Sequence, residues 1–179
     1  MPKKIIIILA LFFSYAVFAQ DSNSSSKQGM KANFSTASIK AYQENSFSKI
    51  SDFYQYLEIL SDASAPKPLK NQVRENINSL FANQEIELVD FTSQKLERIT
   101  LEKLLQKLEN EKNIQFTVKE ENTNETSNDY WLNSYMLEIT REKQSVKIPI
   151  RQKVNFYPQE KQFGNTAKQV WTITLGEIQ

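Results

Sequence analysis

The chain has 179 residues, of which 22 are basic and 21 acidic, so its formal net charge at pH 7 is only +1. This balance, without a basic stripe interleaved with aromatic residues, argues against nucleic acid as a partner. The sequence contains no Cys and no His, which excludes disulfides, thiolate metal sites and the usual base of a serine or cysteine nucleophile. Because only three Gly are present, a glycine-rich phosphate-binding loop is also excluded, and we expect no cofactor.

The N-terminal residues have the pattern of an export signal. Two lysines precede an apolar run over residues 5–13, and Val17 and Ala19 occupy the two positions that a signal peptidase reads. A membrane span needs about 20 apolar residues, more than this run contains. The sequence therefore predicts a signal peptide over residues 1–19, cleaved before Gln20. It predicts an exported protein, periplasmic or secreted, with no membrane span after the signal is removed.

The rest of the chain divides into a leader and one domain. Residues 20–45 are rich in Ser, Lys, Gln and Asn with scattered apolar residues, which is typical of a flexible polar segment. Residues 46–179 carry regular apolar patterns and no internal repeat, so we expect a single α+β domain of ordinary size.

Two amphipathic helices open the predicted domain. Apolar residues recur at helical spacing from Ile50 to Leu60, and either Ser46 or Ser48 is placed to cap this helix. Pro68 suits the first turn of a second helix. The predicted inner stripe of that helix consists of Leu69, Val73, Ile77, Leu80 and Phe81.

The spacing of the apolar residues then changes to every second residue, which is typical of strands. Residues 86–91 and 95–99 form two short predicted strands joined by a polar turn. Thr100 is placed to cap a third helix that ends near Asn110. Its apolar stripe consists of Leu101, Leu104, Leu105 and Leu108.

After the third helix the sequence predicts strands only. We expect strands over residues 114–118, 131–139, 146–156 and 170–178, separated by a charged loop over residues 119–129, a turn over residues 141–144 and a loop over residues 158–167. Pro149 cannot donate a ladder hydrogen bond, so the third of these strands is expected to be bulged there or to lie at an edge.

The predicted order α-α-β-β-α-β-β-β-β resembles the nuclear transport factor 2-like superfamily, also called the cystatin-like cone fold. The segments that carry the resemblance are Phe53–Leu57, the Leu80–Phe81 helix end that leads into residues 86–91, and Trp171–Leu175. The resemblance covers about Ser46 to Ile178. It implies helices packed in a curved, mainly antiparallel sheet, with a pocket at the open end of the cone. Members use such a pocket for isomerase, dehydratase, cyclase or binding roles, often as dimers through the exposed sheet face, and the fold does not select among these.

The resemblance suggests one pair of catalytic candidates. Members that act as cyclases or dehydratases usually place a His with an Asp in the pocket, and this chain has no His. Ketosteroid isomerase-like members instead use a carboxylate base with a Tyr, roles that Asp90 and Tyr54 could take. In the structural alternative, Asp90 is a turn residue before Thr92, and Tyr54 belongs to the core with its hydroxyl at the rim.

Aromatic residues provide the ligand-binding candidates. Tyr130, Trp131 and Tyr135, together with Tyr54, could line a pocket for a small apolar ligand. Aromatic residues at strand spacing are also common in cores and dimer interfaces.

Two charged groups are weaker signals. The acidic residues of the 119–129 loop lack the ligand spacing and central Gly of a calcium loop, so no metal site is expected. The basic row Lys147, Arg151 and Lys153 fits the solvated face of a half-buried sheet, which could also meet an acidic partner.

These observations favour an exported, non-enzymatic binding or interaction module of the cell envelope or periplasm. Its partner would be a small apolar ligand or another protein, and a homodimer through the sheet face is possible. One alternative is a cofactor-free isomerase or lyase of the ketosteroid isomerase-like type, with a carboxylate and a Tyr. The other is an accessory subunit of an envelope or secretion assembly.

Overall fold

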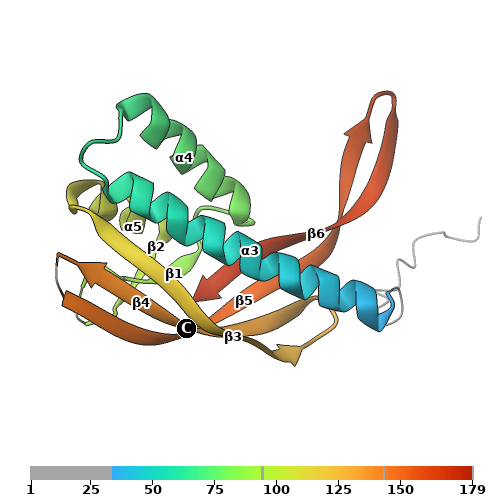
Figure 1. Cartoon of the computed structure of the whole chain (residues 1–179). Helices are drawn as coiled ribbons and strands as arrows, with labels where there is room; N and C mark the ends of the chain where they lie inside the picture. Colours follow the sequence, from blue (N-terminus) through green and yellow to red (C-terminus); the bar gives the residue numbers. More distant parts are fainter. Residues whose placement is uncertain (1–33, 94, 143, 179) are drawn as a thin grey trace, which may run out of the picture.

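The computed structural model describes residues 34–93, 95–142 and 144–178, and Figure 1 shows their arrangement. The elements are α3 (Thr36–Ser61), α4 (Lys67–Leu80), β1 (Glu87–Val89), β2 (Arg98–Thr100), α5 (Leu101–Asn110), β3 (Ile114–Thr126), β4 (Tyr130–Arg141), β5 (Gln144–Phe163) and β6 (Thr166–Ile178). The α+β class and the order of elements are as predicted. The predicted signal peptide and the leader up to residue 33 lie outside the described residues.

An antiparallel sheet in the order β3-β4-β5-β6 forms the base of the molecule, and β1 and β2 pair as a separate antiparallel ribbon. The long helix α3 lies across one face of the main sheet, with α4 and α5 near its C-terminal end (Figure 1). The core therefore lies between α3 and the sheet. Its largest fully buried side chains include Trp131, Tyr54, Phe53 and Phe156.

Helix α3 begins at Thr36, so the predicted leader over residues 20–45 is wrong in its last part. The helix is capped by Ser35, whose hydroxyl accepts a hydrogen bond from the Ser38 amide, and not by Ser46 or Ser48. Only a few apolar side chains project from this first part of the helix. Tyr42 finds aromatic partners, because its ring lies 4.8 Å from that of Phe156 and 5.7 Å from that of Phe34, which precedes the helix.

Helix α4 carries the expected proline in its first turn. Val73, Ile77 and Leu80 are buried as predicted, but Leu69 is 44 % exposed and does not belong to the inner stripe. Phe81 follows the helix and forms an isolated bridge with Leu175 of β6.

The prediction for α5 is confirmed. Thr100 caps the helix by accepting a hydrogen bond from the Lys103 amide. The predicted stripe of four leucines is fully buried, and the helix ends at Asn110.

The last strands are longer than the segments in which apolar residues alternate. β3 continues to Thr126 through most of the predicted 119–129 loop, with two register shifts against β4. β5 continues through the predicted 158–167 loop to Phe163 and pairs with β6 up to a turn at Gly164, whose φ is +60°. Neither extension needs an apolar pattern, because pairing with a neighbouring strand satisfies the backbone.

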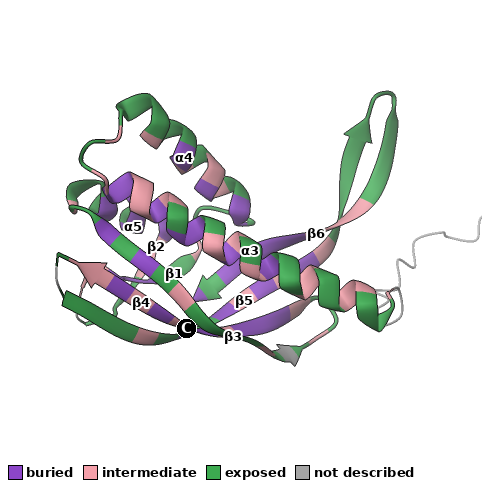
Figure 2. Cartoon of the chain, in the orientation of Figure 1, coloured by how far each residue is buried: buried purple, intermediate pink, exposed green. Residues whose placement is uncertain are grey.

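The extended end of β5 and β6 forms a hairpin arm that projects from the body (Figure 1). Every residue of the arm from Pro158 to Gln169 is exposed, as Figure 2 shows.

Two further predictions concern single residues. Pro149 lies where β5 pairs with β4 only, since β6 reaches no further than Gln152, so the expected edge position is confirmed. Trp171 shares the inner face of β6 with Ile173 and Leu175 but is only partly buried. Trp131 on β4 is the fully buried tryptophan.

Candidate functional site

Tyr54 belongs to a buried hydrogen-bond chain. Its hydroxyl lies 2.9 Å from that of Tyr135, which donates to Oε1 of Gln152 at 2.8 Å. Because the Tyr135 proton is used on Gln152, Tyr54 donates to Tyr135. Burial raises the pKa of both hydroxyls well above the ordinary value for tyrosine, so both remain neutral. The three side chains link α3, β4 and β5 within the core.

Ser46 is the centre of a second buried chain, which the sequence did not predict. Its hydroxyl donates to the Gln43 carbonyl at 2.6 Å and accepts from Trp131 Nε1 at 3.2 Å and Asn133 Nδ2 at 2.7 Å. The side chain predicted to cap a helix therefore ties α3 to β4.

Asp90 is a buried structural carboxylate, only 1 % exposed. One oxygen accepts from the Thr92 amide at 2.8 Å and from its hydroxyl at 2.5 Å, and the other accepts from Lys107 Nζ at 2.5 Å. Burial alone would raise the pKa of Asp90. The hydrogen bonds from Lys107 and Thr92 and the charge of Lys107 outweigh it, so the pKa lies below its ordinary value.

The two catalytic candidates thus have separate partners. Asp90 fixes the turn after β1 to α5 through Lys107, whereas Tyr54 bonds to Tyr135. A carboxylate with a lowered pKa is a poor general base at neutral pH. The turn role expected for Asp90 in the structural alternative fits this geometry, although the side chain is buried and not solvated.

The aromatic ligand candidates do not form one group. Tyr54, Trp131 and Tyr135 are buried in the core. Tyr130 instead lies under Lys153, whose Nζ is 4.7 Å from the ring centroid. Ligand binding by these four side chains stays a prediction, and none of them lines the pocket described next.

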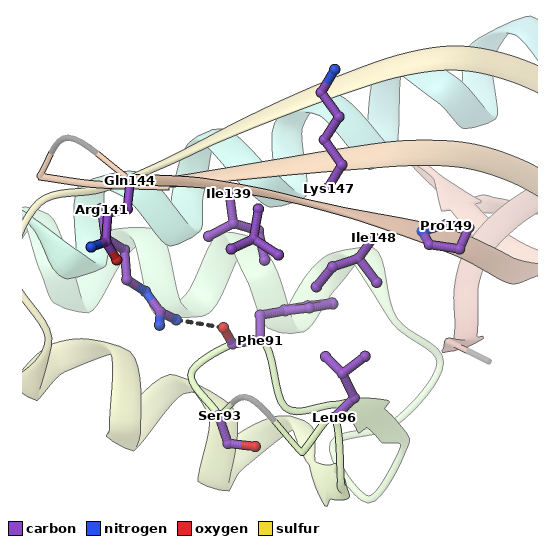
Figure 3. Close-up of a pocket in the computed structure, with 10 residues that line it drawn as sticks. Phe91, Ser93, Leu96, Ile139, Arg141, Gln144, Lys147, Ile148 and Pro149 are labelled. Atoms are coloured by element: carbon purple, nitrogen blue, oxygen red, sulfur yellow. Dashed lines mark hydrogen bonds between the residues drawn. The ribbon is translucent and has the colours of Figure 1, made fainter.

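A pocket of about 470 Å³ lies between the turn joining β1 to β2 and the end of the β4–β5 hairpin (Figure 3). It is lined by Phe91, Ser93, Leu96, Ile139, Arg141, Gln144, Val146, Lys147, Ile148 and Pro149. Most of this lining is apolar, and it comes from two segments far apart in the sequence.

Two of the lining side chains are unusually exposed for their type. Leu96 is 40 % exposed and Val146 is 59 % exposed, which places both among the exposed large apolar side chains of the described chain. Leu96 also has a φ of +50°, a left-handed conformation that is uncommon for a bulky residue. Strained residues of this kind cluster at binding and active sites.

The polar lining residues are Ser93, Arg141, Gln144 and Lys147. An Arg141 Nη atom donates to the Phe91 carbonyl at 2.5 Å, shown as the dashed line in Figure 3. Arg141 Nε and Ser93 Oγ are buried and have no hydrogen-bond partner among the described residues. The amino group of Lys147 points away from the pocket (Figure 3).

Sequence reasoning missed this site because its residues belong to several patterns. Ile139, Val146 and Ile148 belong to the strands predicted over residues 131–139 and 146–156, and their apolar character is already explained by that strand pattern. The signal that could have identified the pocket is Leu96, an apolar residue beside a polar turn.

Comparison with protein-family models and with curated proteins found no match to this sequence. Within the described ranges, no group of three or more acidic side chains is arranged to hold a metal ion. None of the described helices is long and apolar enough to span a membrane.

Proposed function

We propose that this protein is a non-catalytic binding module that takes a small, largely apolar ligand in the pocket between the β1–β2 turn and the β4–β5 hairpin. The single observation that carries the proposal is the pocket itself. Its volume of about 470 Å³ lies within the range of about 300–1,000 Å³ found for small-molecule sites. An apolar concavity with a few polar groups is also the usual composition of such sites.

Asp90 supports binding over the isomerase alternative. That alternative needs a carboxylate whose pKa is raised toward neutrality, and the contacts of Asp90 with Lys107 and Thr92 lower its pKa. Membership of the nuclear transport factor 2-like superfamily is part of the same proposal, supported by the order of the elements.

A place in the cell envelope or periplasm completes the proposal and rests on the signal-like pattern of residues 1–19. The hairpin arm favours the accessory-subunit role as a second candidate. Its tip carries Phe163, which is 53 % exposed, and exposed apolar side chains on a projecting element are suited to contact with another protein.

The test of ligand binding uses the neutral apolar dye Nile red and two matched variants. Leu96→Asn removes an apolar wall of the pocket and suits the left-handed backbone, whereas Leu69→Asn removes a leucine of similar exposure from α4. We expect one dye per wild-type chain, about tenfold weaker binding for Leu96→Asn, and no change for Leu69→Asn. Equal effects of the two variants, or no binding by the wild type, would contradict the proposal.

A further inference from the structure

We infer that the ligand of this pocket carries a carboxylate that binds the Arg141 guanidinium, so that its class is an apolar monocarboxylic acid. This inference rests on the proposed function, because it assigns a carboxylate group to the ligand of the same pocket.

The first argument is charge. Arginine carries a positive charge, yet Arg141 takes part in none of the ion pairs found among the described residues. Its hydrogen bond goes to the neutral Phe91 carbonyl. A guanidinium in an apolar pocket without a counter-charge is costly, and an anionic ligand supplies that charge.

Two carboxylates of the protein near the pocket are committed elsewhere. Asp90, the neighbour of Phe91, accepts from Lys107 and Thr92. Glu138 on β4 accepts from Lys119 at 2.7 Å and from Ser145 at 2.8 Å. Neither is therefore available as the partner of Arg141.

The second argument is that two buried donors of lining residues have no partner. Arg141 Nε and Ser93 Oγ are buried without partners among the described residues, and both belong to side chains that line the pocket. A guanidinium offers N–H groups in a planar fork that matches the two oxygens of a carboxylate.

The number of charges favours a monoanion. Among the described residues that line the pocket, Arg141 and Lys147 are the cations, and the amino group of Lys147 points away from the pocket (Figure 3). A phosphate monoester would bring about two negative charges to a single guanidinium. The walls formed by Phe91, Leu96 and Ile148 then require an apolar remainder.

The experiment compares three probes of equal chain length on the wild-type protein. Decanoate, decan-1-ol and decyltrimethylammonium compete with bound Nile red at neutral pH, below the concentrations at which they form micelles. We expect decanoate to displace the dye at about tenfold lower concentration than decan-1-ol, and only the decanoate value to weaken with added salt. Equal displacement by acid and alcohol, or preference for the cation, overturns the inference and leaves the pocket proposal intact. Absence of dye binding overturns both.

Two variants test whether the carboxylate of the ligand binds at Arg141. Arg141→Gln removes the charge and keeps a polar amide of shorter reach. Arg98→Gln is the matched control, because Arg98 is exposed on β2 and lies 3.6 Å from Glu87. We expect the preference for decanoate to vanish in Arg141→Gln, with dye binding retained, and to persist in Arg98→Gln. A preference that survives in Arg141→Gln overturns the inference. If that variant fails to fold, the wild-type ratio of acid to alcohol decides.

Discussion

At the scale of single residues, the buried polar side chains show how the environment changes the role of a group. The family resemblance suggested Asp90 as a catalytic base and Tyr54 as an oxyanion donor. In the structure, Asp90 is ionised beside Lys107, and Tyr54 is a neutral donor to Tyr135. Both are satisfied by neighbours, which gives them structural roles and removes the reason to expect catalysis from them.

Asp90 should contribute stability that depends on pH. Because its pKa is lowered in the folded protein, its contribution is present above the unfolded pKa of about 3.9 and is lost as the pH falls through the folded value. We expect Asp90→Asn to lower the free energy of unfolding by about 1–3 kcal/mol at pH 7, measured by urea titration, and this difference to shrink below about pH 4.

Glu87→Gln provides the control for Asp90, since Glu87 forms an exposed pair with Arg98 at 3.6 Å. It should change the free energy of unfolding by under about 0.5 kcal/mol. An NMR titration midpoint of Asp90 near neutrality would contradict the structural role and restore the isomerase alternative.

The tyrosine pair should contribute stability that is lost at high pH. The raised pKa values of Tyr54 and Tyr135 mean that their contribution is present below the unfolded value of about 10 and is lost as the pH rises beyond it. We expect both hydroxyls to ionise only with unfolding, followed by absorbance at 295 nm.

The order of the hydrogen bonds predicts unequal effects of the two Phe variants. Tyr135→Phe leaves both Tyr54 and Gln152 Oε1 without a partner, whereas Tyr54→Phe removes only the first donor of the chain. We expect Tyr135→Phe to cost about 1–3 kcal/mol and Tyr54→Phe about 1 kcal/mol. The reverse order would show that the chain runs the other way.

At the scale of elements, strands and helices extend beyond the segments with clear apolar periodicity. The first part of α3 is held through Phe34 and Tyr42, which pack with Phe156. The arm of β5 and β6 is held by strand pairing alone. Local periodicity therefore underestimated the length of α3, β3, β5 and β6, whereas β1 (Glu87–Val89) and β2 (Arg98–Thr100) are shorter than the strands predicted over residues 86–91 and 95–99.

The start of α3 can be tested by truncation. A chain that starts at Ser46 loses Phe34 and Tyr42, and with them their edge-on and tilted ring contacts with Phe156, whereas a chain that starts at Asn33 keeps these contacts. We expect the shorter chain to melt at a clearly lower temperature, because about 2–4 kcal/mol of aromatic contact is removed. Equal melting temperatures in calorimetry would show that the first part of α3 adds nothing to the core.

The two tryptophans differ in their contribution to packing. Trp131 is fully buried and donates to Ser46, while Trp171 is partly buried against Phe34 and Phe156. We expect Trp131→Ala to cost about 3–5 kcal/mol and Trp171→Ala about 1–3 kcal/mol in urea unfolding. A larger loss for Trp171→Ala would mean that the outer end of the sheet, and not its centre, dominates the core.

At the scale of the whole molecule, the helices cover one side of the sheet (Figure 1). The pocket is lined by the core residues Phe91 and Ile139 together with exposed side chains of the β1–β2 turn and the β4–β5 hairpin. The inner face of the sheet beneath α3 is filled by aromatic and leucine side chains. A ligand site therefore requires a place where the turn after β1 stands away from the β4–β5 hairpin, and this is where the pocket forms.

The location of the protein is also a property of the whole chain. If residues 1–19 act as a signal peptide, the protein isolated from its cells begins at Gln20 and is recovered with the periplasmic or secreted fraction. Intact-mass measurement and N-terminal sequencing check this expectation. A chain that retains Met1 and fractionates with the cytosol would refute the export hypothesis.

The sequence by itself determined the class of the fold, the order of its elements and much of the core. These follow from local periodicity and capping, as the four leucines of α5 and the cap at Thr100 show. Pro149 was placed at an edge for an equally local reason, its missing amide hydrogen.

Only the tertiary structure decided where the polar groups find partners. Ser46 meets Trp131, and Lys107 meets Asp90, across separations that no local pattern records. The candidate site has the same origin, since Leu96 and Val146 come from different hairpins and form a pocket only when these pack together. Such contacts depend on three-dimensional proximity between distant segments, whereas periodicity reports only which face of its own element a residue occupies.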